Sequence, residues 1–312
     1  MSTPFFSIVL PTKDREFLLQ PLIESILAQD FKNFELIIAD NSDTESVQDL
    51  ILQFQDIRLK NIRTGGLNMA DNWDQSIKLA SGKYMLLFSD KMVLKRGALN
   101  FLYSFLNKND IDCVTWDIDI ISDKEKRYFH NPQPNKISKI SSKELMKSIL
   151  LSDHLSFEMA PFHCNSCISV KLLNNIRSEF GRVSFQLNPD YTLAYQVLLK
   201  IDRIYRIDHS LVMLRQKDLE TGYGNGFSFV HKTKTANKFM RDNKDWVLRT
   251  GERNEIPIHG NKFLIDIMLK DLYEILKMHD VDPQIYATLD ERLISYYCRT
   301  LDEIYWLSLI HI

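Results

Sequence analysis

The chain has 312 residues, of which 45% are hydrophobic and 26% are charged, a composition typical of a globular protein with a sizeable core. Lys and Arg number 39 against 41 Asp and Glu, which gives a formal net charge of -2 at pH 7. This balance provides no global basic field, so we expect no nucleic-acid partner.

The first ten residues, Met-Ser-Thr-Pro-Phe-Phe-Ser-Ile-Val-Leu, lack the basic start and the longer apolar segment of a secretory signal peptide. No apolar run elsewhere approaches the length that crosses a bilayer. We therefore interpret this start as a core strand and expect a cytoplasmic protein.

Short apolar runs alternate with helix-spaced apolar residues along the first 120 residues. The runs predict buried strands at residues 5–10, 34–39, 84–88 and 112–118, with a minor strand at 59–63. Helical patterns separate them at residues 18–27, 47–54, 69–80 and 95–106. Strands this apolar are buried on both faces, so the pattern predicts an α/β fold with a mostly parallel sheet between helices.

The pattern loosens after residue 122, where we expect a loop at 131–135, a helix at 142–151, a strand at 164–170 and a helix from about 190. Alternate glycines at residues 222–226 suggest a mobile lid. From residue 261 onward the chain is typical of helices. We expect one larger domain at residues 1–230, followed by a C-terminal helical region at 231–312.

Three polar clusters follow the ends of predicted strands, at residues 11–15, 40–43 and 89–91. In sheets of this kind ligands bind beyond the carboxyl ends of the strands. The three clusters are therefore expected to meet in one crevice.

The chain has four cysteines, Cys113, Cys164, Cys167 and Cys298. Only the stretch His163-Cys-Asn-Ser-Cys167 has the spacing of metal ligands, and a structural zinc site needs a second pair of ligands. We interpret these cysteines as small buried hydrophobic residues.

Pro11-Thr-Lys-Asp-Arg15, Asp40-Asn-Ser42 and Ser89-Asp90, together with the patterns at residues 68–80 and 82–88, resemble the nucleotide-binding half of a family 2 glycosyltransferase. The resemblance is good over residues 5–120, looser over 160–215 and slight in the C-terminal helices. It implies the GT-A fold, a nucleotide-activated sugar donor and inversion at the anomeric carbon. It also implies that residues 1–230 are a GT-A catalytic domain, with a nucleotide-binding half at 1–120 and an acceptor-binding, catalytic half at 121–230.

By this resemblance Pro11, Thr12 and Arg15 hold the base and ribose, and Asp40 pairs with the imide of uracil or thymine. A carboxylate suits that place because a charged acceptor strengthens a hydrogen bond from an imide N–H. The alternative for Asp40 is a turn former or a helix N-cap.

Asp90 matches the first acid of the family's acidic pair, which faces ribose, whereas the second acid, a direct metal ligand, corresponds to Lys91. An ammonium cannot bind a divalent cation, but it can stabilise a departing diphosphate. We therefore expect Lys91 to substitute partly or wholly for Mn²⁺ or Mg²⁺. The alternative is that Lys91 points to solvent while Asp90, another nearby acid or His231 helps to hold the metal.

Asp190 matches the carboxylate that removes the proton of the acceptor hydroxyl. The family's usual motif is Glu-Asp, whereas this chain has Pro189-Asp190. The alternative is that Asp190 only caps the helix that follows, a role worth about 1 kcal/mol.

The resemblance thus implies an inverting hexosyltransferase that uses a UDP-sugar and a glycan or lipid-linked oligosaccharide acceptor in bacterial surface polysaccharide synthesis. A degenerate GT-A-like scaffold stays open, as does a nucleotidyltransferase, although that class carries a glycine-rich loop that residues 11–15 lack. The aromatic and apolar helices after Leu289 leave three alternatives: peripheral contact with the inner face of the membrane, a homodimer, or packing on their own domain.

Overall fold

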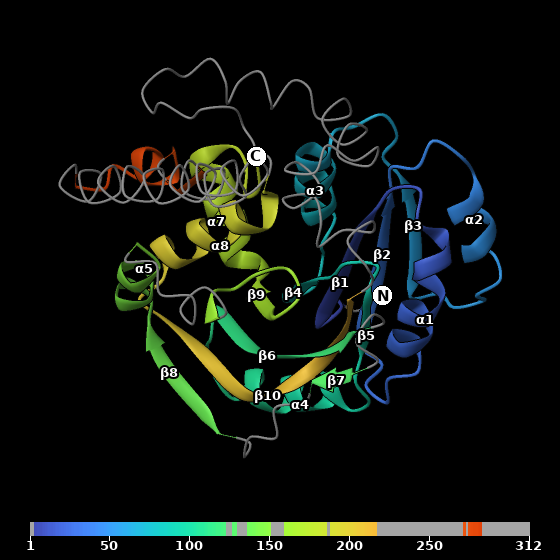
Figure 1. Ribbon diagram of the computed structural model, residues 1–312, viewed down its shortest axis with the longest axis horizontal. Helices are drawn as coiled ribbons and strands as arrows, with labels where there is room; N and C mark the ends of the chain where they lie inside the picture. The colour runs from blue at the N-terminus through green and yellow to red at the C-terminus, as the bar shows by residue number, and fades with distance from the viewer. Residues whose placement is uncertain are drawn as a thin grey trace, which may run out of the picture.

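The computed structural model describes residues 3–122, 127–129, 136–150, 159–185, 188–216, 271–272 and 274–282 (Figure 1). The predictions for residues 131–135 and 222–226, for His231 and Cys298, and for the helices after Leu289 lie outside these residues. The predicted boundary between residues 230 and 231 lies outside them too.

Within the described ranges, ten strands form one sheet whose main path runs β3-β2-β1-β4-β9-β6-β10-β5, while β7 pairs with β6 and β8 with β10. The strands are β1 (Phe6–Thr12), β2 (Phe34–Asp40), β3 (Leu59–Arg63), β4 (Tyr84–Leu87), β5 (Met92–Leu94), β6 (Cys113–Ser122), β7 (Arg127–Phe129), β8 (Ile137–Ser141), β9 (Ser166–Ser169) and β10 (Arg203–Gln216). The strands β1 to β4 are parallel to one another.

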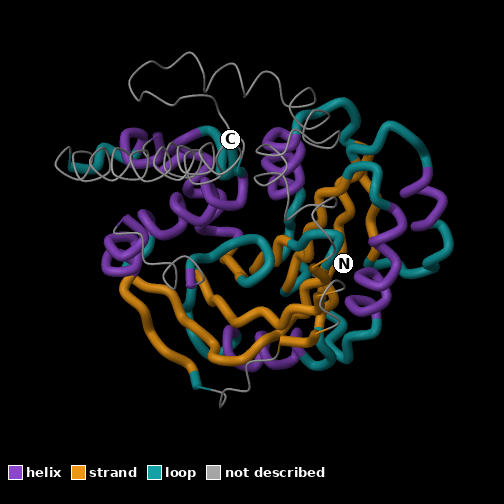
Figure 2. The backbone as a smooth tube through the Cα atoms, in the orientation of Figure 1, coloured by secondary structure: helices purple, strands orange, loops and turns teal. Residues whose placement is uncertain are grey.

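Helices cover both faces of this sheet (Figure 2). They are α1 (Glu16–Leu27), α2 (Ser46–Ile51), α3 (Met69–Lys78), α4 (Ala98–Leu106), α5 (Ser142–Leu150), α7 (Val170–Phe180) and α8 (Pro189–Lys200). Because successive side chains of a strand point to opposite faces, Ile8 and Leu10 of β1 pack in one core with α1, α2 and α4. Val9 packs in a second core with α3, α5, α7 and α8. The predicted α/β architecture is confirmed.

The strand β9 runs antiparallel to β4, with Tyr84 opposite Ser169 and Leu86 opposite Cys167. The residues just before β9 therefore lie at the same edge of the sheet as the residues just after β4. This pairing brings the loop that contains His163 to the edge where Asp90 and Lys91 follow β4.

Part of the C-terminal region packs on α7 and α8. Residues 271–272 and 274–278 are helical, and Leu272, Ile275 and Leu276 are buried in the same core as α7 and α8. In Figure 1 this orange-red segment lies beside α7. None of the helices in the described part of the chain is both long and apolar enough to cross a bilayer.

Candidate functional site

The loops after β1 and β2 are tied together at the carboxyl edge of the sheet. The backbone N–H of Asp14 donates to Oγ of Ser42, and Oδ1 of Asp14 accepts from the N–H of Asp43, both at 2.9 Å. Asp14 adopts the left-handed conformation, with φ of 53°, which Asp tolerates better than most residues. The predicted meeting of these two polar clusters is confirmed.

Asp40 is fully buried at the end of β2. Its Oδ1 accepts the N–H of Ser42 at 2.9 Å, and its Oδ2 accepts Nη1 of Arg63 at 3.0 Å. The first bond is the turn-forming role considered above. A carboxylate offers about four acceptor sites, so binding of an imide N–H by Asp40 stays a prediction.

Thr12 ends β1 next to Asp40, with which it is in register. Its Oγ1 is buried and has no hydrogen-bond partner among the described residues. Buried hydroxyls are normally satisfied, so Thr12 is suited to bind a ligand at this edge. Pro11 precedes it in the strand and is buried.

Arg15 reaches from the start of α1 to Asp90, which is buried after β4. Its Nη1 lies 3.4 Å from both Oδ1 and Oδ2 of Asp90. The structure therefore brings together two residues that the family resemblance assigns to the ribose.

Lys91 is half-buried beside this pair. Burial, and then the positive charge of Arg15, lower the pKa of Lys91 to about 8, although the negative charge of Asp90 acts in the opposite direction. Its ammonium forms no ion pair or side-chain hydrogen bond with any described residue. The Lys91 carbonyl accepts the N–H of Arg215 at 2.9 Å, so the backbone is held while the cationic end is available.

The described residues at Asp90 do not fit a divalent cation. Its carboxylate is flanked by two cationic residues, Arg15 and Lys91, whose positive charges oppose the binding of a divalent cation. No group of three or more His, Cys, Asp or Glu in the described ranges is placed to hold a metal ion.

Asp190 lies in the first turn of α8, after Asn188 at the N-cap position and Pro189 at the start of the helix. Asp190 is therefore not the N-cap residue. Its Oδ2 lies 3.4 Å from Nδ1 of His163, and each of the two side chains is about a fifth exposed, at 23% and 21%. No sequence pattern predicts this pairing of His163 with Asp190.

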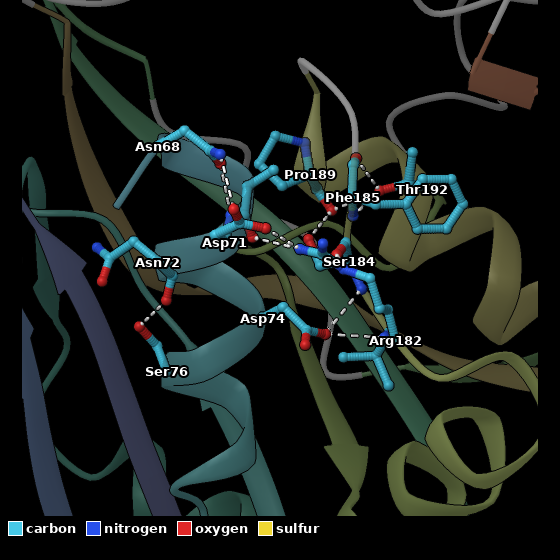
Figure 3. A network of polar contacts seen from close by, with 12 residues as sticks. Asn68, Asp71, Asn72, Asp74, Ser76, Arg182, Ser184, Phe185, Pro189 and Thr192 are labelled. Carbon is cyan, nitrogen blue, oxygen red and sulfur yellow. Dashed lines mark hydrogen bonds and ion pairs between the residues drawn. The ribbon is translucent and has the colours of Figure 1, made fainter. Parts of the chain in front are cut away.

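Hydrogen bonds hold the first turn of α8 to the segment before it (Figure 3). Oγ of Ser184 donates to the carbonyl of Pro189 at 2.8 Å, and Oγ1 of Thr192 donates to the carbonyl of Phe185 at 2.9 Å. The position of Asp190 thus depends on residues 182–185.

Two acids of α3 in turn hold residues 182–185. Asp71 accepts Nη2 of Arg182 at 2.7 Å, and Asp74 accepts the N–H of Val183 at 2.9 Å and Nη2 of Arg177 at 3.1 Å. Figure 3 shows these acids pointing from α3 toward the segment. The helix α3 therefore helps to position the first turn of α8, which carries the candidate base Asp190.

The three described cysteines are free, and Cys113 and Cys167 are buried as expected. Burial, followed by the negative charge of Asp190, raises the pKa of Cys164 to about 12. These thiols remain protonated at neutral pH and are poor nucleophiles and metal ligands.

The sequence model described as Glycosyl transferase family 2 matches residues 7–168, about half of the chain. The chain belongs to this family. The family match contains Asp40, Asp90, Lys91 and His163, whereas Asp190 lies beyond it.

Two curated relatives are similar to parts of this glycosyltransferase family 2 chain. The Campylobacter jejuni GalNAc(5)-diNAcBac-PP-undecaprenol beta-1,3-glucosyltransferase is 31% identical over 109 residues, which cover 34% of this chain and 35% of that protein. The Escherichia coli UDP-Glc:alpha-D-GlcNAc-diphosphoundecaprenol beta-1,3-glucosyltransferase WfgD is 27% identical over 119 residues, which cover 37% of this chain and 46% of that protein. The matches thus span less than half of either relative.

The family 2 chain also has the fold of S. aureus TarS, whose residues 1–349 were solved in complex with UDP-GlcNAc. The two structures superpose with a TM-score of 0.55 at 15% identity, over 91% of this chain and 83% of that one. The predicted GT-A fold is confirmed.

Proposed function

We propose that this chain is an inverting glycosyltransferase that moves a sugar from a UDP-sugar to a hydroxyl of a lipid-linked saccharide in bacterial surface glycan synthesis. In this proposal Pro11, Thr12 and Asp40 hold the base, Arg15 and Asp90 hold the ribose, and Lys91 meets the diphosphate. Asp190 is the base.

The reaction exchanges one bond for another at the anomeric carbon. The acceptor oxygen forms a bond to the anomeric carbon. At the same time the bond between that carbon and the β-phosphate oxygen breaks, and its electron pair leaves with UDP. The proton of the acceptor hydroxyl moves to the carboxylate of Asp190. The ammonium of Lys91 stabilises the negative charge that develops on the diphosphate.

The single observation that carries the proposal is the ammonium of Lys91, which is half-buried and forms no ion pair with any described residue. Removing a cation from water without a counter-ion is costly. A diphosphate bound at this edge would provide that counter-ion.

The relatives support the choice of substrates. The name of WfgD includes UDP-Glc, and the names of both glucosyltransferases include an undecaprenol-linked diphosphate. An acceptor with such a lipid anchor lies in a membrane, so the proposal places the reaction at a membrane surface.

Calorimetric titration with UDP, followed by a panel of UDP-, GDP- and dTDP-sugars assayed for nucleotide release, tests the proposal. We expect UDP to bind at micromolar levels and one UDP-sugar to be turned over. Asp190→Asn should reduce turnover by about 100-fold or more and leave UDP binding unchanged. Asp202→Asn, an exposed acid just beyond the other end of α8, is the matched control and should behave as the native chain.

Two results would contradict the proposal. A chain that binds no UDP would instead be the scaffold considered as an alternative. Native turnover by Asp190→Asn would remove the proposed base while leaving donor binding intact.

A further inference from the structure

The imidazole of His163 faces the carboxylate of Asp190 from the loop before β9. Its Nδ1 is buried, has no hydrogen bond of regular geometry with any described residue, and lies 3.4 Å from Oδ2 of Asp190. That distance exceeds a normal charge-assisted bond of about 2.7–2.9 Å. Catalytic hydrogen bonds are often long in a ligand-free protein and shorten when the substrate is bound.

We propose that His163 is a positioning residue for Asp190: its Nδ1–H donates to Oδ2 and turns Oδ1 toward the acceptor hydroxyl. The inference rests on the proposed function, in which Asp190 is the base. It adds a residue outside the positions at which the family resemblance assigned roles.

His163 is itself held by α3. Its ring packs edge-on against Trp73, with centroids 5.2 Å apart and an interplanar angle of 71°. The same helix holds residues 182–185 through Asp71 and Asp74. One rigid element thus fixes both the imidazole and the segment that carries the carboxylate.

The chemical consequence concerns the two carboxylate oxygens. A carboxylate that rotates freely presents either oxygen in a range of directions, and misplacement of a reacting group by about 1 Å can cost about 100-fold in rate. A hydrogen bond from Nδ1–H of His163 to Oδ2 would fix the plane of the Asp190 carboxylate. The nitrogen that carries the proton of an imidazole is set by the hydrogen bonds that its ring makes, so Asp190 would favour a proton on Nδ1.

His163→Leu and His163→Asn form a matched pair, since the two side chains have the same number of heavy atoms but only Asn has an amide donor near the place of Nδ1. With the donor sugar identified in the panel, we expect His163→Leu to lower kcat by about 10- to 100-fold, with native KM and native UDP binding. His163→Asn should recover most of that loss.

His209→Leu is the control variant. His209 is also half-buried, packs edge-on against an aromatic ring, Phe101 at 4.8 Å, and has a buried Nδ1 without a regular hydrogen bond among the described residues. It does not touch Asp190, so its loss should leave kcat unchanged.

Nitrogen-15 NMR of labelled histidines gives a measurement that needs no substrate. The ring nitrogens of His163 should report a proton on Nδ1 in the native chain and should shift in Asp190→Asn, whereas those of His209 should not. Identical His163 signals in both proteins would overturn the inference. Native kcat in His163→Leu, or equal losses in the Leu and Asn variants, would overturn it as well.

These failures differ from failure of the proposed function. A native chain that binds no UDP would overturn both. Normal UDP binding and turnover with no effect of His163→Leu would overturn the positioning role alone.

Discussion

Oδ2 of Asp271 accepts a hydrogen bond of 3.2 Å from Nδ2 of Asn188. Asn188 is the N-cap of α8, two residues before Asp190, and Asp271 is fully buried in the C-terminal region. A residue from that region therefore contacts the start of the helix that carries the candidate base. The described part of the C-terminal region therefore helps to hold the start of α8.

Leu276 provides a test of this contact between the two regions. Its side chain is 1% exposed in the core of α7 and α8, so Leu276→Ala should lower the free energy of unfolding by about 2–5 kcal/mol. Met278→Ala, on the same helix but 38% exposed, should cost under about 1 kcal/mol. Circular dichroism during urea unfolding measures both. Separate transitions, with the catalytic half unaffected by Leu276→Ala, would contradict joint packing.

The sequence predicted most elements of the first 120 residues well, because most of the strands there are continuous apolar runs. The end of β1 was misjudged: residues 5–10 were predicted, but the strand runs to Thr12, since Pro11 and Thr12 stay in register with Ala39 and Asp40. The sequence pattern does not predict that extension, because proline lacks the N–H that a central strand needs for its hydrogen bonds and therefore argues against a strand.

The second half was harder to predict. The predicted strand at 164–170 is shorter, since Ser169 caps α7 by accepting the N–H of Leu172 at 3.1 Å. The strand β10 was missed because its polar and apolar residues do not alternate regularly, and its register shifts near Ser210. Its stability comes from pairing with β6 and β8, which a local pattern cannot reveal.

The candidate site also has one part that could be predicted from the sequence and one part that could not. Arg15, Asp40, Asp90 and Lys91 follow recognisable strand ends, so the sequence could place them at one edge. The pair of His163 and Asp190 depends on the antiparallel direction of β9 and on the bonds that hold α8 to residues 182–185. No spacing in the sequence encodes that meeting.

UDP binding should weaken as the pH rises from 7 to 9. The pKa of Lys91 is lowered to about 8, so its side chain is mostly charged at pH 7 and mostly neutral at pH 9, and a neutral amine attracts the diphosphate less. We expect the Kd for UDP to rise by up to about tenfold over this range. Calorimetry of Lys91→Arg, whose charge persists to high pH, should show a flatter profile. An equally steep profile in Lys91→Met would assign the effect to another group.

Chelation should leave part of the turnover intact. The residues around Asp90 do not fit a divalent cation, and Lys91 offers positive charge at the same place. We expect nucleotide release from the accepted donor to continue in EDTA, and to fall about 10- to 100-fold in Lys91→Met, because a hydrogen bond to a charged group is worth about 1.5–3 kcal/mol. Complete loss in EDTA, restored by Mn²⁺ or Mg²⁺, would show that Lys91 does not replace the metal.

Glu35 should make the fold sensitive to acid. Burial alone would raise the pKa of Glu35, but hydrogen bonds from Lys60, Ser7 and Ser81 lower it overall. A lowered pKa gives stability that is present above the unfolded value of about 4.3 and is lost as the pH falls through the folded value. Glu35→Gln should therefore cost about 1–3 kcal/mol at pH 7, and its difference from the native chain should shrink below about pH 4.

Glu179→Gln is the matched control for this prediction. Glu179 also pairs with a lysine, Lys200 at 2.7 Å, but its side chain is 53% exposed. An exposed pair is worth under about 1 kcal/mol. Urea unfolding at pH 7 and pH 3.5 separates the two variants, and equal costs for both would show that the buried position of Glu35 does not matter.

Asp74 should matter for both stability and turnover, because it joins α3 to the segment before the candidate base. Its Oδ1 accepts the backbone N–H of Val183 and Nη2 of Arg177. Asp74→Ala leaves the buried N–H of Val183 unpaired and takes the carboxylate from Arg177, which keeps only the Asp74 carbonyl, so the change should cost about 2–4 kcal/mol. Asp71→Ala removes one of the acceptors of Arg182, and the Asp71 side chain is 35% exposed, so this change should cost about 1 kcal/mol or less.

Asp74→Ala should also lower kcat more than Asp71→Ala does. If residues 182–185 position Asp190, then Asp74→Ala lowers kcat at a temperature where the variant is still folded. UDP binding by the loops after β1, β2 and β4 should stay native. Comparing kcat with the Kd for UDP at 10 °C and 25 °C separates loss of position from loss of fold. Native kcat in a folded Asp74→Ala protein would show that the first turn of α8 keeps Asp190 in place without help from α3.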